Sequence, residues 1–379
     1  MTLLKPLKNE RGIALLVTLS VITVLVAVTL TQHRQVYHYY SAAHATARLL
    51  MGEQMAEAGI QAAMALLVKD ARESQLDSLQ EPWADPEKRA ELAAELQFEQ
   101  GSVSFSISDE LSRIQVNALV LYPAGQQYNP QQLVLWNRFM EVMTAGREFS
   151  EQIEPLTIIS ALKDWLDFND GDAITGLNGA ENDYYRNLDP PYDCRNGPIQ
   201  DLSELRLVRG ISDELIQGAD EKLGLQRYLT VHGMTAARAG KFTYRGRINL
   251  NTAELPVIAA LLPAEHADLA ETIVEYRDAT DDGNYIHDLS SPTWYKEAPG
   301  CGQIVINPRL LTPRSDLFRI EATAQMGETW RRITVVAERK NNPTTGKFYC
   351  HVLSRQVDGG RIQTTETAQN RMTNLLEQP

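Results

Sequence analysis

The chain has 379 residues, of which 43% are hydrophobic, 7% aromatic and 22% charged, as in ordinary globular proteins. This composition excludes a collagen-like, an intrinsically disordered and a small disulfide-stapled protein. The formal net charge of −13 argues against a surface that covers nucleic-acid phosphates. The length allows two to three domains of roughly 100–200 residues each.

The chain begins with a short basic segment followed by a long apolar one. Residues 1–12 carry three basic side chains against Glu10, and residues 13–31 contain no charged residue, Gly or Pro. At about 1.5 Å per residue, the apolar stretch nearly crosses a hydrocarbon core of about 30 Å. Basic residues before such a segment place the N-terminus in the cytoplasm and the bulk of the chain on the other side. A cleavable secretory signal has the same order, but no persuasive small-x-small cleavage site follows.

The sequence after the apolar stretch continues to favour a helix. It contains no Pro and few turn residues as far as Arg72. We therefore expect one helix from about Ile13 to about Arg72, with a membrane-spanning half and an amphipathic half.

A basic leader that ends in Gly, followed by such a helix, resembles the N-terminus of type IV pilins and pseudopilins. The resemblance implies that a prepilin leader peptidase cuts between Gly12 and Ile13 and methylates the new amine. The fifth position after the cut, usually Glu in that family, is Val17 here. Because a carboxylate within a bilayer is costly unless it is paired, the family's Glu is thought to pair with the terminal amine of a neighbouring subunit. A subunit without it lacks one subunit-joining contact, which is tolerable at the end of a filament and damaging within it.

Three blocks of alternating apolar and polar residues predict strands further along the chain. The first, residues 96–117, is interpreted as a hairpin or meander. The second, residues 317–340, is broken by a turn at residues 326–328, and the third ends near Val357. Residues 118–312 are helix-like and rich in loops. We therefore expect an α+β fold, in which a small antiparallel sheet packs on the N-terminal helix and is interrupted by a large, mainly α-helical insertion domain.

These expectations divide the chain into six segments. Residues 1–12 are a leader, residues 13–32 the membrane half of the helix, and residues 33–117 the soluble half-helix with the first strands. Residues 118–312 are the insertion and residues 313–357 the remaining strands. Residues 358–379 are a polar tail that we expect to be disordered.

An acidic stretch, residues 164–193, lies within the insertion. Carboxylates, Asn side chains and backbone carbonyls supply the roughly six to eight oxygen ligands that Ca²⁺ takes. The stretch does not match an EF-hand, because Gly171 comes one position early and no Glu ends the loop. It indicates either a calcium loop of another design or a solvated acidic loop. A second acidic turn, residues 278–284, favours an exposed turn over a metal site.

Two segments, residues 205–225 and 248–263, resemble helix-hairpin-helix elements, in which a Gly turn lets backbone N–H groups approach a phosphate. Residues 201–224 carry more acidic than basic side chains, so DNA contact is the weaker interpretation. We expect both segments to form the packed core of the insertion, with Asn249 and Asn251 capping a following helix.

The sequence contains no motif that indicates catalysis. Its seven histidines are scattered, and no G-x-S-x-G, H-E-x-x-H, P-loop or Cys–His arrangement has a convincing context. We therefore expect no enzyme. Cys194 and Cys301 both lie in the insertion, so a disulfide between them is one open alternative in an oxidising compartment. Cys350 is expected to be a buried thiol in a strand.

The order of several motifs resembles the K-type minor pseudopilins of the bacterial type II secretion system, over residues 12 to about 357. The motifs are RGIALLVTL, DWLD followed by GAENDYY, LDPPY, LSELRLVRG and INLNTAE. The resemblance implies one or two Ca²⁺ ions bound in the insertion. The ligands carried over are Asp167, Asn169, Asp172, Glu181 and Asp183, with Asp170 and Asp189 in reserve.

The same resemblance implies a single-pass protein of the bacterial inner membrane, with its N-terminus in the cytoplasm and its bulk in the periplasm. Such a subunit caps and helps to initiate the pseudopilus that exports folded periplasmic proteins across the outer membrane. The implied partners are minor pseudopilins of the I and J kinds, the major pseudopilin filament, the leader peptidase and the inner-membrane assembly platform, and no nucleic acid is expected. The alternatives are a minor pilin of a DNA-uptake or type IV pilus system and a membrane-anchored periplasmic hydrolase.

Apolar positions on the soluble half-helix are candidate partner contacts, although many of them should face the protein's own sheet. They are Leu49, Leu50, Met51, Ile60 and Met64.

Overall fold

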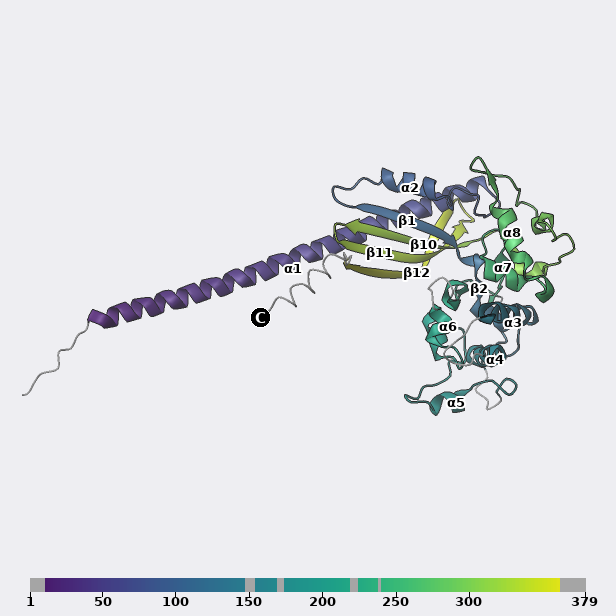
Figure 1. Ribbon diagram of the computed structural model, residues 1–379, viewed down its shortest axis with the longest axis horizontal. Coiled ribbons are helices and arrows are strands. Elements are labelled where there is room, and N and C mark those ends of the chain that lie inside the picture. The colour runs from purple at the N-terminus through teal and green to yellow at the C-terminus, as the bar shows by residue number, and fades with distance from the viewer. Residues whose placement is uncertain (1–10, 147–153, 169–173, 219–223, 238–239, 362–379) are drawn as a thin grey trace, which may run out of the picture.

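The computed structural model describes residues 11–146, 154–168, 174–218, 224–237 and 240–361. One helix, α1 (Arg11–Glu73), projects far beyond the rest of the molecule, which lies at its C-terminal end (Figure 1). With 63 residues, α1 is about 95 Å long. The side chains of residues 12–51 are exposed, and an 18-residue window of the helix has a mean hydropathy of 2.8, enough to cross a membrane by length and composition. The long helix predicted from the sequence is therefore confirmed.

The C-terminal part of α1 packs on a four-stranded antiparallel sheet. Its strands are β1 (Ser102–Asp109), β10 (Leu317–Met326), β11 (Thr329–Asn341) and β12 (Phe348–Arg361), in the order β1-β10-β11-β12. Alternate side chains of β1 and β10 are buried against the helix, as the period of two requires. The helix comes close to the sheet at Gly59, where an added Cβ would lie 3.0 Å from Val103 Cγ2. Together with the insertion described below, this is the predicted α+β, pilin-like arrangement.

The predicted hairpin or meander at residues 96–117 was wrong. The two strands in this stretch do not pair with each other: β1 pairs with β10, more than 200 residues later, with Asp109 opposite Phe318 in the register, and the two-residue strand at Ile114–Gln115 pairs elsewhere in the insertion. Strand β1 ends because Asp109 accepts a hydrogen bond from the backbone N–H of Leu111 at 2.7 Å and so caps a 3₁₀ turn. Helix α2 (Pro86–Glu95) also contacts β1, and its Ala93 is buried in the same hydrophobic cluster as Phe105 and Ile107.

The boundary predicted at residue 357 was also wrong, because β12 continues to Arg361. Residues 358–361 pair with residues 329–332 of β11 and are strand rather than tail. Two glycines permit this pairing: a Cβ at Gly359 would lie 2.5 Å from Arg331 Cδ, so a larger residue would press on that side chain. Residues 362–379 lie outside the described residues.

The insertion runs between β1 and β10 and has its own hydrophobic core, separate from the cluster between α1 and the sheet. Its helices are α3 (Pro130–Thr144), α4 (Pro155–Leu166), α5 (Asn182–Arg186), α6 (Asp213–Gln217), α7 (Leu255–Leu261) and α8 (Leu269–Asp278). Short 3₁₀ helices lie at Glu110–Ser112, Val116–Leu119, Leu202–Leu207, Leu225–Arg227, Ala264–His266, Trp294–Glu297 and Pro308–Leu310.

The described residues of the insertion also form four small strand pairs. They are β2 (Ile114–Gln115) with β3 (Leu229–Thr230), β4 (Met234–Ala236) with β5 (Phe242–Tyr244), β6 (Ile248–Asn249) with β9 (Leu311–Thr312), and β7 (Thr280–Asp281) with β8 (Asn284–Tyr285). The β2–β3 and β6–β9 pairs are parallel.

Buried polar side chains join the insertion to the pilin-like body. The Asn249 amide donates to the carbonyl oxygen of Asp77 at 2.9 Å and to Asp109 Oδ2 at 2.8 Å, and the Thr252 hydroxyl donates to the same Asp109 oxygen at 2.7 Å. Burial raises the pKa of Asp109 to about 6, although its hydrogen bonds oppose that shift. The INLNTAE motif therefore anchors one body to the other.

The prediction that Asn249 and Asn251 cap a helix was wrong. Helix α7 begins six residues after Asn249, and Glu254 stands at its N-cap without a side-chain cap bond. Asn251 instead accepts a hydrogen bond from the indole N–H of Trp294 at 2.7 Å. Without these two asparagines, the carbonyl of Asp77 and the indole N–H of Trp294 would each lose a buried hydrogen-bond partner.

Candidate functional sites

Three carboxylates converge in the insertion. Asp164, Asp167 and Glu181 each place one oxygen within 4.8 Å of the others, and all three side chains are buried. Asp164 lies in the last turn of α4, and Asp167 is the residue that ends it. Because residues three apart share a helix face, both carboxylates point the same way. Glu181 joins them from the start of α5.

Asp164 is held in place by the loop that follows α4. It accepts hydrogen bonds at 3.0 Å from the backbone N–H of Thr175 and at 2.9 Å from that of Ala180. An added Cβ at Gly179 would lie 2.0 Å from Asp164 Oδ2, so this approach requires glycine. Burial is the main cause that raises the pKa of Asp164.

One lysine offsets part of the negative charge. Lys163 Nζ lies 2.5 Å from Asp167 Oδ2 and 3.8 Å from Asp164 Oδ1. Burying several carboxylates together is costly unless protons or cations compensate their charge. The donors are all oxygens, which suits a hard cation such as Ca²⁺. The described residues therefore fit part of a calcium site.

The structure brings together only some of the predicted ligands. Asp167 and Glu181 belong to the carboxylate cluster, whereas the side chains of Asp183 and Asp189 are exposed and lie outside it. Asn169, Asp170 and Asp172 are outside the described residues. Asp164 was missed as a ligand, although its spacing of three from Asp167 at the end of an amphipathic helix was a usable signal.

The structure does not form the disulfide considered between Cys194 and Cys301, because both are free thiols held in different parts of the insertion core. Cys194 Sγ contacts the carbonyl oxygen of Asp164, and Cys301 Sγ contacts that of Pro299, each at 3.7 Å. Cys350 lies in β12 as expected, but it is half-buried.

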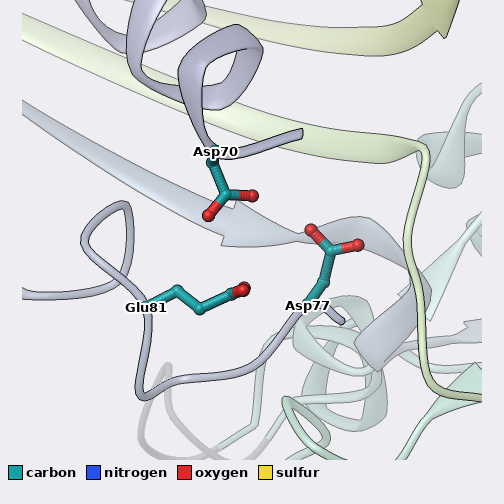
Figure 2. Close-up of side chains that lie close together, drawn as sticks. All are labelled: Asp70, Asp77 and Glu81. Atoms are coloured by element: carbon teal, nitrogen blue, oxygen red, sulfur yellow. The ribbon is translucent and has the colours of Figure 1, made fainter. Parts of the chain in front are cut away.

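A second group of carboxylates lies where α1 ends. Figure 2 shows Asp70 on the last turns of the helix, with Asp77 and Glu81 on the segment that follows, and their oxygens lie within 4.8 Å of one another. This group has its own cation: Arg339 of β11 lies 2.9 Å from Asp70 Oδ2 through Nη1 and 2.6 Å from Asp77 Oδ1 through Nη2. We call these residues the junction ion pairs.

Burial strongly shifts the pKa of a carboxylate in the junction ion pairs. Burial raises the pKa of Asp70 to about 7, with repulsion from Glu81 and Asp77 adding to the shift and Arg339 opposing it. Glu81 accepts hydrogen bonds at 3.0 Å from the Ser78 N–H and the indole of Trp83. Since an arginine already occupies the group, we interpret it as a structural connection between α1 and β11 rather than a metal centre.

The candidate contact positions on the soluble half of α1 fall into a buried set and an exposed set. Ile60 and Met64 are only 1% and 8% exposed because they pack on the protein's own sheet. Leu49, Leu50 and Met51 are 39%, 58% and 47% exposed. Nearer the N-terminus, Gly12, Ile13 and Val17 all lie within α1, and the side chains of Ile13 and Val17 are exposed.

The two segments that resemble helix-hairpin-helix elements are packed into the insertion core. Leu205, Leu215 and Ile258 are at most 1% exposed. The two arginines of the first segment are engaged within the chain: Arg206 pairs with Asp213 at 3.3 Å, and the guanidinium of Arg209 lies 4.8 Å from the ring centre of Tyr184.

Comparison with known proteins links this architecture to one family. The family model for type II secretion system (T2SS), protein K matches residues 112–223. Type II secretion system protein K of Klebsiella pneumoniae is 27% identical over 76% of this chain and 81% of its own. The corresponding protein of Pseudomonas aeruginosa is 27% identical over 64% of this chain and 60% of its own.

A solved structure has the same fold. A chain of the GspK–GspI–GspJ complex from the enterotoxigenic Escherichia coli type 2 secretion system aligns with a TM-score of 0.56 at 16% identity. The alignment covers 83% of this chain and 99% of that one.

Proposed function

Because this chain belongs to the type II secretion system protein K family and is therefore a minor pseudopilin, we propose that it caps the secretion pseudopilus and helps to initiate it. In this role it acts without catalysis, in the export of folded periplasmic proteins across the outer membrane. The feature that supports the proposal is α1, whose exposed apolar part has Val17 at the position where the pilin family that it resembles usually has Glu. The insertion gives the subunit a bulk that suits the end of a filament better than its interior.

The partners we propose are minor pseudopilins of the I and J kinds. The matched structure is a complex whose named components are GspK, GspI and GspJ. In this chain the exposed apolar side chains at residues 49–51 offer a surface for neighbouring helices just outside the predicted membrane half. Contacts with the major pseudopilin filament and the inner-membrane assembly platform belong to the same proposal.

Replacing Leu50 by Glu should remove the I and J partners. Leu50 is 58% exposed in the free protein, and a carboxylate there would have to lose its water in a helix–helix contact. We expect at least tenfold less of both partners to copurify with the tagged full-length variant from membranes. Gln61→Glu, which adds the same charge at another exposed position of α1, should leave the complex intact. Full recovery of both partners with L50E would contradict this contact.

We also propose that the leader peptidase removes residues 1–12 and methylates the Ile13 amine, with the N-terminus in the cytoplasm. The mass of the chain purified from cells with the peptidase should correspond to a methylated chain starting at Ile13. The chain made without the peptidase should keep its leader. A native chain that retains residues 1–12 in the presence of the peptidase would exclude this processing.

The last part of the proposal is that Ca²⁺ binds in the insertion. Asp164, Asp167 and Glu181 would hold it, and the ion would add positive charge beside these three buried carboxylates. Asn169, Asp170, Asp172, Asp183 and Asp189 stay predictions as further ligands.

A further inference from the structure

A groove lies between the four-stranded sheet and the insertion, away from the carboxylate cluster. Its cavity volume is about 860 Å³. One side is formed by the ends of β11 and β12, with Lys340, Phe348 and Leu353, and the other by β4 and the segment around Arg247. Figure 1 shows β12 at the border of the sheet that faces the insertion. The volume falls within the range of about 300–1,000 Å³ that ligand sites occupy.

The groove is basic in a protein that is acidic overall. Of the charged residues that line it, Arg113 pairs with Glu110 at 3.0 Å and Lys340 pairs with Glu338 at 2.6 Å. Arg245 interacts electrostatically with Asp316, and Arg339 belongs to the junction ion pairs.

Two arginines remain after these pairs. Among the residues that the structure describes, neither Arg247 nor Arg314 has a carboxylate within ion-pair distance. Arg247 is exposed, and Arg314 donates to the side-chain oxygen of Gln75 at 3.2 Å and lies 6.0 Å from the ring centre of Phe348. The net charge of the whole chain is −13, so this local excess of arginine runs against the rest of the molecule.

Apolar side chains lie beside these arginines. Met234 and Leu353 are 61% and 41% exposed. In the pairing of β11 with β12, Val336 lies opposite Ser354 and Ala337 lies opposite Val352, so Leu353 has no partner. Leu353 is therefore the extra residue of a β-bulge. In addition, β12 is the last strand of the sheet, and its outer backbone edge pairs with no strand of the described chain. Such an edge binds extended segments.

We propose that the groove binds an extended acidic segment of a partner protein. Carboxylates of the segment pair with Arg247 and Arg314, whose planar guanidinium groups suit two-point contact with carboxylates. Apolar side chains of the segment cover Met234 and Leu353. A small inorganic anion would fill little of 860 Å³ and would leave these apolar groups uncovered. The inference does not depend on the capping role proposed above.

The test uses the full-length protein in detergent and a fluorescent, end-capped hexapeptide of alternating Glu and Leu. We expect saturable binding that weakens as salt rises, because salt screens exposed charge pairs. Arg247→Gln combined with Arg314→Gln should weaken binding at least tenfold. Lys69→Gln combined with Arg332→Gln removes the same charge at exposed positions outside the groove and should change binding less than twofold.

Three outcomes would overturn the proposal. They are equal binding by R247Q/R314Q and the wild type, equal binding of the hexapeptide in which Gln replaces Glu, and displacement of the peptide by millimolar inorganic phosphate, which would indicate a small-anion site. Met234→Asp gives a second variant that an exposed position should tolerate, and it should also weaken binding at least tenfold. Because I and J partners are absent from this assay, its failure leaves the family assignment and the capping proposal unaffected.

Discussion

Calcium should raise the midpoint of thermal unfolding of the wild-type protein by about 5–10 °C relative to the same protein in chelator. A ligand that binds only the folded state at about one hundred times its dissociation constant stabilises that state by about 2.7 kcal/mol. For a body of 150–250 residues, each kcal/mol moves the midpoint by roughly 2–4 °C. The measurement is calorimetry of the full-length protein in detergent, with millimolar Ca²⁺ or with chelator.

Variants of the carboxylate cluster should separate metal binding from local structure. Asp167→Asn and Glu181→Gln should remove most of the calcium-dependent shift, because each takes a charge from the cluster. Asp164→Ala should in addition lower the midpoint in chelator, because two backbone N–H groups then lose their acceptor, at about 1–3 kcal/mol each. Asp281→Asn combined with Asp282→Asn, in the exposed β7–β8 turn, should leave the shift unchanged. Identical midpoints with calcium and with chelator in the wild type would exclude the site.

Replacing Arg339 by Met should lower the free energy of unfolding by about 3–5 kcal/mol at pH 8, the cost of leaving a buried ion pair without one partner. The side chains of Arg339, Asp70 and Asp77 are at most 5% exposed, so water cannot replace the lost guanidinium. Denaturant unfolding of the full-length protein measures the change. Arg332→Met, at an exposed position of the same strand, should change the free energy of unfolding by less than about 0.5 kcal/mol. An equal effect of both variants would show that the junction ion pairs do not stabilise the fold.

The loss in the Arg339 variant should depend on pH. Burial already raises the pKa of Asp70 from 3.8 to about 7, and Arg339 opposes that shift, so its removal raises the pKa further. A carboxyl group whose pKa is higher in the folded state contributes stability below its unfolded pKa and loses it as pH rises through the folded pKa. The variant continues to lose stability above pH 7, where the wild-type contribution has levelled off. The difference between variant and wild type should therefore be smaller at pH 5 than at pH 8.

The elements that local pattern determines were predictable from the sequence. A run of apolar residues without a charged or helix-breaking residue predicts the membrane half of α1. Alternating apolar and polar residues predict β10 and β11 with the turn between them. The pairing of β1 with β10 was not predictable, because its partner lies beyond the whole insertion and no local turn signals it. The end of β12 was missed because paired glycines look like a loop in sequence, whereas here they let the strand pass beneath Arg331.

The candidate sites also combine residues that the sequence pattern indicates with residues that only the folded structure brings together. The acidic stretch was visible, yet Asp164 was overlooked because it belongs to a helix and not to the loop that looked like a metal site. Arg339 and Asp70 lie 269 positions apart, so no spacing rule connects them. Asn249 looked like a helix cap, and only the packed structure shows that its amide reaches Asp77 and Asp109 on the other body.

The register between β1 and β10 determines where the insertion joins the sheet. Asp109 and Phe318 face each other across neighbouring strands, so the chain leaves the sheet and returns to it about 5 Å away. A turn of two to five residues spans that gap in ordinary β-hairpins. The insertion therefore begins and ends at neighbouring points of the sheet, and any shorter connection between these two strand ends would have to cover Asp77 and Asp109, which the insertion buries.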